Sequence, residues 1–161
     1  MVARLFVILR PLMQITRRLE FDAGHRIPNH ASQCRHLHGH RYAIEITLSG
    51  PVVATPGAAD EGMVLDFSTV KSIAQKTIVE PWDHAFLAWR RDQAVVIFLD
   101  SLPAHKTVQF DAPPTAEHLA QTAFNLLDPL YQGCYGNDLK LERVRIYETP
   151  NCWADAVRRE D

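Results

Sequence analysis

The strongest constraint on the fold is a strand-like alternation of apolar and polar side chains that recurs along the chain. Every second residue from Tyr42 to Leu48 is apolar, and polar residues such as Glu45 and Thr47 lie between them. A side-chain period of two is typical of a strand with one buried face. On this pattern we expect strands over residues 14–21, 40–49, 139–148 and 153–157.

Two other segments have helical spacing. A helix is expected from about Ser68 to Pro81, and another is expected to begin after Thr115, a plausible N-cap. A short helix over residues 92–102 and an extended segment over 106–110 complete the pattern. The order predicts an α+β fold in which helices cover one face of a small antiparallel sheet. The other face would stay open, so we expect the chain to oligomerise through the sheet.

Composition limits the possible functions. We interpret residues 1–13 as an N-terminal extension, too short to span a membrane, and residues 14–161 as a single domain. The net charge is -2 and no basic block occurs, so we expect no nucleic-acid partner and no membrane partner. The three widely spaced cysteines are a poor disulfide framework and favour a cytoplasmic location.

Three histidines form the main candidate site. His38 and His40 lie two apart at the start of an expected strand, so both rings can point to one face, and Gly39 between them permits close backbone approach. His25 would come from a second element. Three imidazoles with one open position are typical of catalytic Zn²⁺, which we therefore expect as the cofactor. The alternative is a set of ordinary surface or core histidines. We interpret the other candidates, His30, His36, His105 and His118, as ordinary polar residues.

Cys34 and the Asp83-His84 pair could supply further chemistry. Cys34 lies four residues before His38, in a polar loop. It could be the fourth ligand of a structural zinc site, or a thiol whose pKa a nearby metal lowers so that it acts as base or nucleophile. An adjacent Asp and His can form a base oriented by a carboxylate, although such pairs are usually structural.

Two glutamates are candidate binding residues. Glu148 shares a strand face with the apolar Val144 and Ile146. A carboxylate there is costly unless it is paired, either with a protein arginine or with a ligand that offers two parallel N–H donors. Glu117 lies near the start of its helix, where a carboxylate usually only complements the helix dipole.

Together these residues resemble the 6-pyruvoyl-tetrahydropterin synthase / 6-carboxytetrahydropterin synthase family, from about Thr16 to Ala156. The resemblance rests, in order, on Phe21-Asp22-Ala23-Gly24-His25, Cys34-x-x-x-His38-Gly39-His40, Asp83-His84, Pro114-Thr115-Ala116-Glu117 and Glu148-Thr149-Pro150. It implies the tunnelling fold, a four-stranded antiparallel sheet with two main helices packed on one face. It also implies a homohexamer built as a dimer of trimers, which would cover the open sheet face.

The resemblance also implies roles for the site residues. The three histidines would bind Zn²⁺, Cys34 would be the general base, and Asp83 and His84 would orient and relay protons. Glu148 would anchor the amino-pyrimidinone edge of a pterin, with Thr115 and Glu117 near the pterin pocket. Family sites are shared between subunits, so the resemblance also allows Cys34 and Glu148 to act from different chains.

The spacing of three residues between Cys34 and His38 resembles the 6-carboxytetrahydropterin synthases of the queuosine pathway, whereas the pyruvoyl-forming enzymes tend to have a longer one. The expected reaction is conversion of dihydroneopterin triphosphate to 6-carboxytetrahydropterin, with release of acetaldehyde and triphosphate. The alternatives are the pyruvoyl-forming reaction and a non-catalytic zinc-binding scaffold. Trp82, Ala88 and a longer segment over residues 90–112 depart from the family pattern.

Overall fold

One mixed sheet of six strands runs through the described chain. The computed structural model describes residues 12–159, and the strands lie in the order β4-β3-β1-β2-β5-β6. Their bounds are β1 Leu12–His25, β2 His38–Pro51, β3 Ala85–Trp89, β4 Thr107–Phe110, β5 Lys140–Thr149 and β6 Cys152–Val157. The four strands predicted from the alternation are all present, and the extended segment near residue 108 is β4.

The prediction of a four-stranded antiparallel sheet is wrong, because two short parallel strands extend the sheet. β1, β2, β5 and β6 do pair antiparallel. However, β3 runs parallel to the last three residues of β1, and β4 runs parallel to β3. The sequence of β3, Ala-Phe-Leu-Ala-Trp, is five residues long and contains no charged residue, and it is buried or half-buried throughout. A parallel strand covered on both faces shows no alternation, so the period of two could not identify it.

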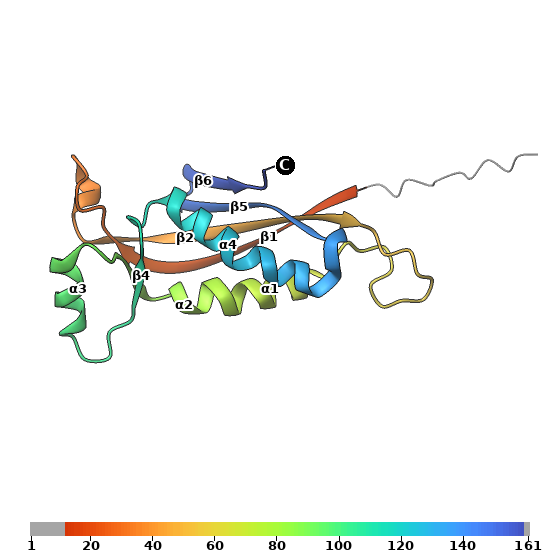
Figure 1. Cartoon of the computed structure of the whole chain (residues 1–161), viewed down its shortest axis with the longest axis horizontal. Coiled ribbons are helices and arrows are strands. Elements are labelled where there is room, and N and C mark those ends of the chain that lie inside the picture. Colours follow the sequence, from red (N-terminus) through yellow and green to blue (C-terminus); the bar gives the residue numbers. More distant parts are fainter. Residues whose placement is uncertain (1–11, 160–161) are drawn as a thin grey trace, which may run out of the picture.

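Two main helical stretches cover one face of the sheet (Figure 1). The first is continuous and consists of α1 (Phe67–Ala74), a π-helical segment (Gln75–Val79) and α2 (Glu80–Trp82). The second is α4 (Ala116–Tyr135), which packs on β5 and β6. This agrees with the expected pair of helices. The third helix, α3 (Gln93–Asp100), lies beside β3 and β4 at one end of the molecule.

Side-chain caps fix where the two main helical stretches begin. The carboxylate of Asp66 accepts a hydrogen bond of 2.6 Å from the backbone N–H of Ser68. The hydroxyl of Thr115 accepts one of 3.4 Å from the N–H of His118, which confirms the predicted cap. Each cap satisfies one of the N–H groups that the first helical turn leaves without a partner.

The core lies between the helices and the alternating apolar residues of the sheet. On β2, the side chains of Tyr42, Ile44, Ile46 and Leu48 are fully buried. Burial of one such side chain stabilises the fold by about 1.5–3 kcal/mol. The same face of β2 carries His38 and His40 at its N-terminal end, so the core leads directly to the candidate metal site.

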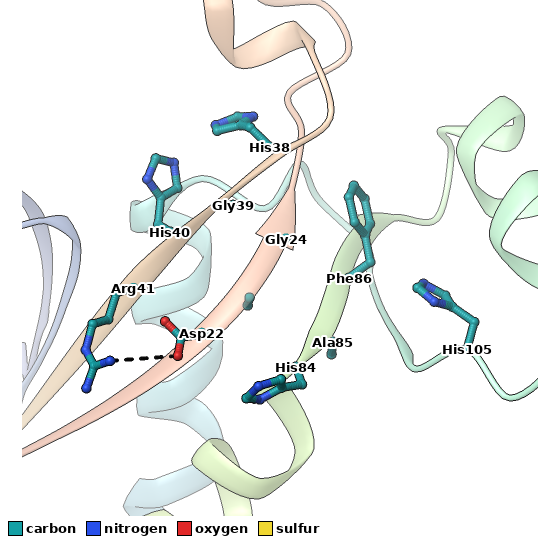
Figure 2. A pocket seen from close by; sticks show the side chains of 11 residues that line it. Asp22, Gly24, His38, Gly39, His40, Arg41, His84, Ala85, Phe86 and His105 are labelled. Carbon is teal, nitrogen blue, oxygen red and sulfur yellow. Dashed lines mark ion pairs between the residues drawn. The ribbon is translucent and has the colours of Figure 1, made fainter.

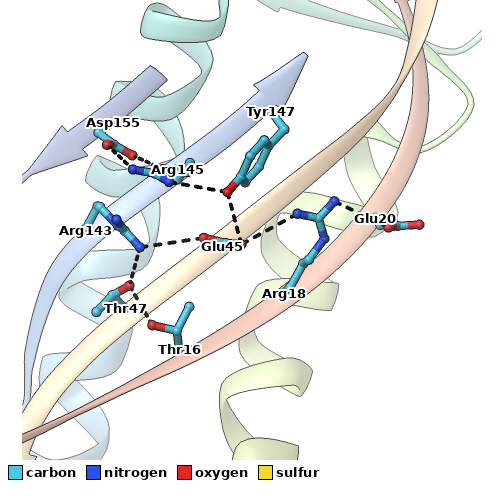
Figure 3. Close-up of polar contacts among 9 residues, drawn as sticks. All are labelled: Thr16, Arg18, Glu20, Glu45, Thr47, Arg143, Arg145, Tyr147 and Asp155. Atoms are coloured by element: carbon cyan, nitrogen blue, oxygen red, sulfur yellow. Dashed lines mark hydrogen bonds and ion pairs between the residues drawn. The ribbon is translucent and has the colours of Figure 1, made fainter. Parts of the chain in front are cut away.

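The opposite face of the sheet is polar and carries a linked set of charges (Figure 3). Glu45 lies 3.6 Å from both Arg18 and Arg143, and Arg145 forms two hydrogen bonds of 2.7 Å with Asp155. Because these charges are paired within the chain, a second copy could cover the face without leaving a charge unpaired. Oligomerisation through this face stays a prediction.

The expected N-terminal extension lies mostly outside the described residues. Its last two residues, Leu12 and Met13, already belong to β1 and pair with Pro51 and Gly50. The division into an extension and one domain therefore stays a prediction. Over residues 12–159, no helix has the length and apolar character required to cross a bilayer.

Candidate metal centre and adjoining cavities

The three predicted histidines converge where β1 ends and β2 begins. His25 is the last residue of β1 and pairs directly with His38, and His40 pairs with Ala23. The Nε2 atoms of His25 and His38 are 3.1 Å apart, and one nitrogen from each of the three rings lies within 4.8 Å of the others. The prediction that His38 and His40 share a face with a third histidine is confirmed.

A close approach of the two strands makes this convergence possible. A Cβ atom at Gly39 would lie 2.9 Å from the carbonyl oxygen of Ala23. At Gly24, which pairs with Gly39, it would lie 2.9 Å from the ring of Phe86 on β3. Backbone atoms cannot move aside as a flexible side chain can, so position 39 requires glycine.

Hydrogen bonds to the rings leave nitrogen lone pairs available for a metal ion. His25 donates from Nδ1 to the carbonyl oxygen of Pro114 at 2.9 Å, and His38 donates from Nδ1 to that of His36 at 2.8 Å. Such bonds fix the tautomer in which Nε2 carries the free lone pair. The Nε2 atom of His40 is buried and has no hydrogen-bond partner among the described residues. An unpartnered buried nitrogen is costly, and a metal ion would relieve that cost.

Burial favours the neutral form of these rings. His25 is 0% exposed. Burial lowers the pKa of His25 and that of His40 below the ordinary histidine value. Neutral imidazole is the form that binds metal ions. The three histidines can therefore hold a metal ion. Cys34 is not part of this ligand cluster within residues 12–159.

A cavity of about 250 Å³ brings together four of the predicted site residues. Cys34, Thr115, Glu117 and Glu148 line it together with Ile27, His30, Ala116, Cys152 and Trp153. Sequence reasoning missed Cys152 and Trp153, although the tight connection between β5 and β6 places them beside the end of β5. One chain brings both Cys34 and Glu148 to this cavity, so the structure gives no support to their acting from different chains.

Glu148 connects the cavity to the histidine cluster. Its Oε1 atom lies 3.6 Å from Nε2 of His40, and its side chain is 23% exposed. Among the described residues, Glu148 has no ion pair with an arginine, which was the alternative to ligand binding.

Glu117, the second carboxylate of the cavity, has a lowered pKa. Hydrogen bonds from the backbone N–H of Glu117 and from the Thr115 hydroxyl cause this, so the carboxylate stays ionised at neutral pH.

His84 lines a second, larger hollow of about 620 Å³, together with His38 and His40 of the histidine cluster (Figure 2). Nδ1 of His84 is 2.9 Å from Oδ2 of Asp83, as in a base oriented by a carboxylate. Asp83 also accepts a 2.9 Å bond from the backbone N–H of Asp22. This bond is the main reason why the pKa of Asp83 is lowered.

The position of His84 is unusual and exposed. Its φ angle is 55°, a conformation that costs a non-glycine residue about 1–3 kcal/mol and is concentrated at functional sites. Its side chain is 79% exposed. His84 does not line the cavity that holds Cys34, and the hollow that it does line reaches the histidine cluster from another side. Phe86 and His105, which the sequence analysis did not select, line the hollow beside it.

These observations define an α+β protein with a candidate three-histidine metal centre, flanked by a cavity that holds a thiol and two carboxylates. A family model described as 6-pyruvoyl tetrahydropterin synthase matches residues 14–159. The chain belongs to this family, which confirms the resemblance seen in the sequence. The family and the relatives below support a tetrahydropterin synthase function, and hence an enzyme.

Individual relatives agree with this assignment. A Rickettsia felis protein named 6-carboxy-5,6,7,8-tetrahydropterin synthase is 35% identical over 144 residues, which cover 89% of this chain and 99% of the relative. A solved structure of an uncharacterized protein from Wolinella succinogenes has a TM-score of 0.75 at 21% identity, covering 92% of this chain and 99% of the other. The 6-pyruvoyl tetrahydropterin synthase of Plasmodium vivax has a TM-score of 0.69 at 18% identity, covering 93% and 99%. At these identities the two structures show a shared fold.

Proposed function

We propose that this protein is a zinc-dependent 6-carboxytetrahydropterin synthase. It would convert dihydroneopterin triphosphate and one molecule of water to 6-carboxytetrahydropterin, acetaldehyde and triphosphate, in the cytoplasm and as a step of queuosine biosynthesis. The observation that carries the proposal is the cavity that holds Cys34 and Glu148, because Glu148 also lies 3.6 Å from His40 of the three-histidine cluster. The name of the Rickettsia felis relative supports the carboxy product.

The donor set favours zinc over other metal ions. Three neutral imidazoles with a position left open are typical of catalytic Zn²⁺, whereas Mg²⁺ and Ca²⁺ prefer oxygen ligands. When bound, zinc would act as a Lewis acid on the side-chain hydroxyls of the substrate. The carbonyl oxygens of Pro114 and His36 would keep two of the rings correctly oriented.

The remaining residues would bind the pterin and move protons. Glu148 would accept two parallel N–H bonds from the amino-pyrimidinone edge, which is the pairing its position on the sheet requires. Thr115 and Glu117 would line the same pocket. The Cys34 thiolate would remove a proton from the substrate side chain, and the triphosphate would leave with the electron pair of its C–O bond.

Asp83 and His84 would complete the site from another copy of the chain. The exposed side chain of His84 and the sheet face that the two main helical stretches leave uncovered (Figure 1) both favour contact with a second copy. The homohexamer built as a dimer of trimers is the assembly that the family resemblance implies. In that assembly His84 would relay a proton while Asp83 holds the ring by its 2.9 Å contact.

The second candidate is the pyruvoyl-forming reaction on the same substrate, which the name of the Plasmodium vivax structure favours. A third is a zinc-binding scaffold without turnover. A scaffold without turnover has no need of a thiol in a cavity beside three histidines that can bind a metal ion.

Product analysis tests the proposed reaction. We expect incubation with dihydroneopterin triphosphate to yield acetaldehyde and triphosphate in equal amounts, together with the 6-carboxy pterin. Only carbon–carbon cleavage releases acetaldehyde, so its assay separates the two enzymes. A pyruvoyl product without acetaldehyde would establish the second candidate, and no turnover of any kind would favour the scaffold.

Binding of the pterin ring tests the role of Glu148. Glu148→Gln replaces an acceptor oxygen with a donor, so one ligand N–H would meet another donor. We expect a loss of about 2–3 kcal/mol, as for a hydrogen bond to a charged group, or about 30- to 150-fold in Kd for neopterin. Calorimetric titration measures this, with metal content checked in parallel because His40 is near. Glu20→Gln, on the opposite face, is the matched control, and equal affinity in both variants would refute the assignment.

A further inference from the structure

A bidentate ion pair between Arg26 and Asp92 joins the end of β1 at the metal site to the long segment over residues 90–112. Arg26 directly follows the ligand candidate His25. Its Nε lies 2.6 Å from Oδ2 of Asp92, and its Nη2 lies 2.7 Å from Oδ1. Asp92 is only 8% exposed. A bidentate arginine–carboxylate pair fixes orientation as well as distance, so it locates the backbone at Arg26.

Asp92 is itself firmly placed. Its backbone N–H donates to the carbonyl oxygen of Trp89 at 2.8 Å, at the end of β3. Its own carbonyl oxygen accepts bonds of 3.1 and 3.0 Å from Val95 and Val96 in the first turn of α3. Both valines are buried. The carboxylate therefore stands on the rigid junction between β3 and α3, and not on a free loop.

The other side of Arg26 leads to Cys34. The backbone N–H of Ile27, the next residue, donates to the carbonyl oxygen of Cys34 at 2.7 Å. Ile27 and Cys34 also line the same cavity. This bond closes the loop between β1 and β2 near its base, and the Arg26–Asp92 pair holds that base against α3. Figure 1 shows α3 and this loop at the same end of the sheet.

We infer that Asp92 is a positioning residue that acts through Arg26 and Ile27 to hold Cys34 at the reaction site. The inference rests on the proposed catalytic role of Cys34. It gives the segment over residues 90–112 a function, which is to supply a fixed carboxylate behind the thiol loop. Neither Asp92 nor Arg26 touches the cavity that holds Cys34.

The test compares Asp92→Asn with Asp111→Asn. Asp111 belongs to the same segment and pairs with Arg90, but it is exposed and has no bond to the loop. For Asp92→Asn we expect kcat to fall about 10- to 100-fold, as for a small misplacement of a catalytic group, while KM and bound zinc stay near those of the parent. Asp92→Glu should recover part of kcat because it restores the charge.

Alkylation by iodoacetamide, followed peptide by peptide by mass spectrometry, reads the loop directly. In Asp92→Asn we expect Cys34 to react several-fold faster, because the loop is released, and the exposed Cys134 and Cys152 to react as before. If kcat and the Cys34 rate match those of Asp111→Asn, the inference is overturned. This assay does not require turnover, so failure of the proposed function, seen as full activity in Cys34→Ala, is distinguishable from failure of the inference.

A second variant covers the case in which Asp92→Asn does not fold. Arg26→Met/Asp92→Leu removes the pair without leaving a buried charge, and such replacements are often neutral for stability. The inference requires this variant to fold, to bind zinc and still to show low kcat and fast Cys34 alkylation. Parent values of both would overturn it.

Discussion

His38→Ala is expected to remove bound zinc and turnover together. The variant leaves only His25 and His40 as ligands, and two imidazoles do not make the three-ligand set of a catalytic zinc site. Loss of a residue that merely orients a ligand costs about 10–100-fold in metal affinity, so loss of the ligand itself should cost more. His38 is the best choice of the three because it is only partly buried, whereas His25 is fully buried and its loss would also disturb the core.

The measurement is zinc content per chain after dialysis against a weak chelator, together with turnover of dihydroneopterin triphosphate. His36→Ala is the matched control. Its side chain is exposed, and the variant keeps the backbone carbonyl that accepts the bond from His38. Full zinc occupancy in His38→Ala would show that the three histidines are not the ligands.

The long strands could be predicted because apolar side chains on their buried face alternate with polar side chains on the other face. Ile44 and Ile46 are buried while Glu45 between them faces the polar side, so period two is visible in the sequence. β3 escapes the same reasoning since its residues are apolar on both faces. It pairs with β1 only at Ala23, Gly24 and His25. No local sequence pattern predicts a contact between residues so distant in the chain.

Part of the candidate site could also be predicted from the sequence. Two histidines that lie two residues apart on a strand share one face, and a carboxylate at Glu148 on an apolar face requires a partner. The Arg26–Asp92 pair joins residues 66 positions apart, and neither residue stands out in its own segment. His84 has a left-handed backbone conformation after α2 and lines a different cavity from Cys34, and neither feature is visible in a local sequence pattern.

The local positions of Cys34 and the histidines lead to the second large expected effect. The ligand cluster within residues 12–159 consists of the three histidines alone, and Cys34 stands on the loop that lines the adjoining cavity. A general base contributes about 10²–10⁴-fold to rate, so Cys34→Ala should lose that much in kcat. Because the three histidines remain, zinc content and the oligomeric state should not change.

Zinc analysis, sedimentation and single-turnover kinetics on one preparation of Cys34→Ala measure these three quantities. Cys152→Ala is the matched control, because it removes a second thiol from the same cavity without touching the loop between β1 and β2. Stoichiometric loss of zinc from Cys34→Ala would mean that the thiol is a fourth ligand of a structural site. Retained zinc with lost turnover would mean that Cys34 is the base. Removal of a metal ligand weakens zinc binding, whereas removal of a base that does not touch the metal leaves zinc binding unchanged.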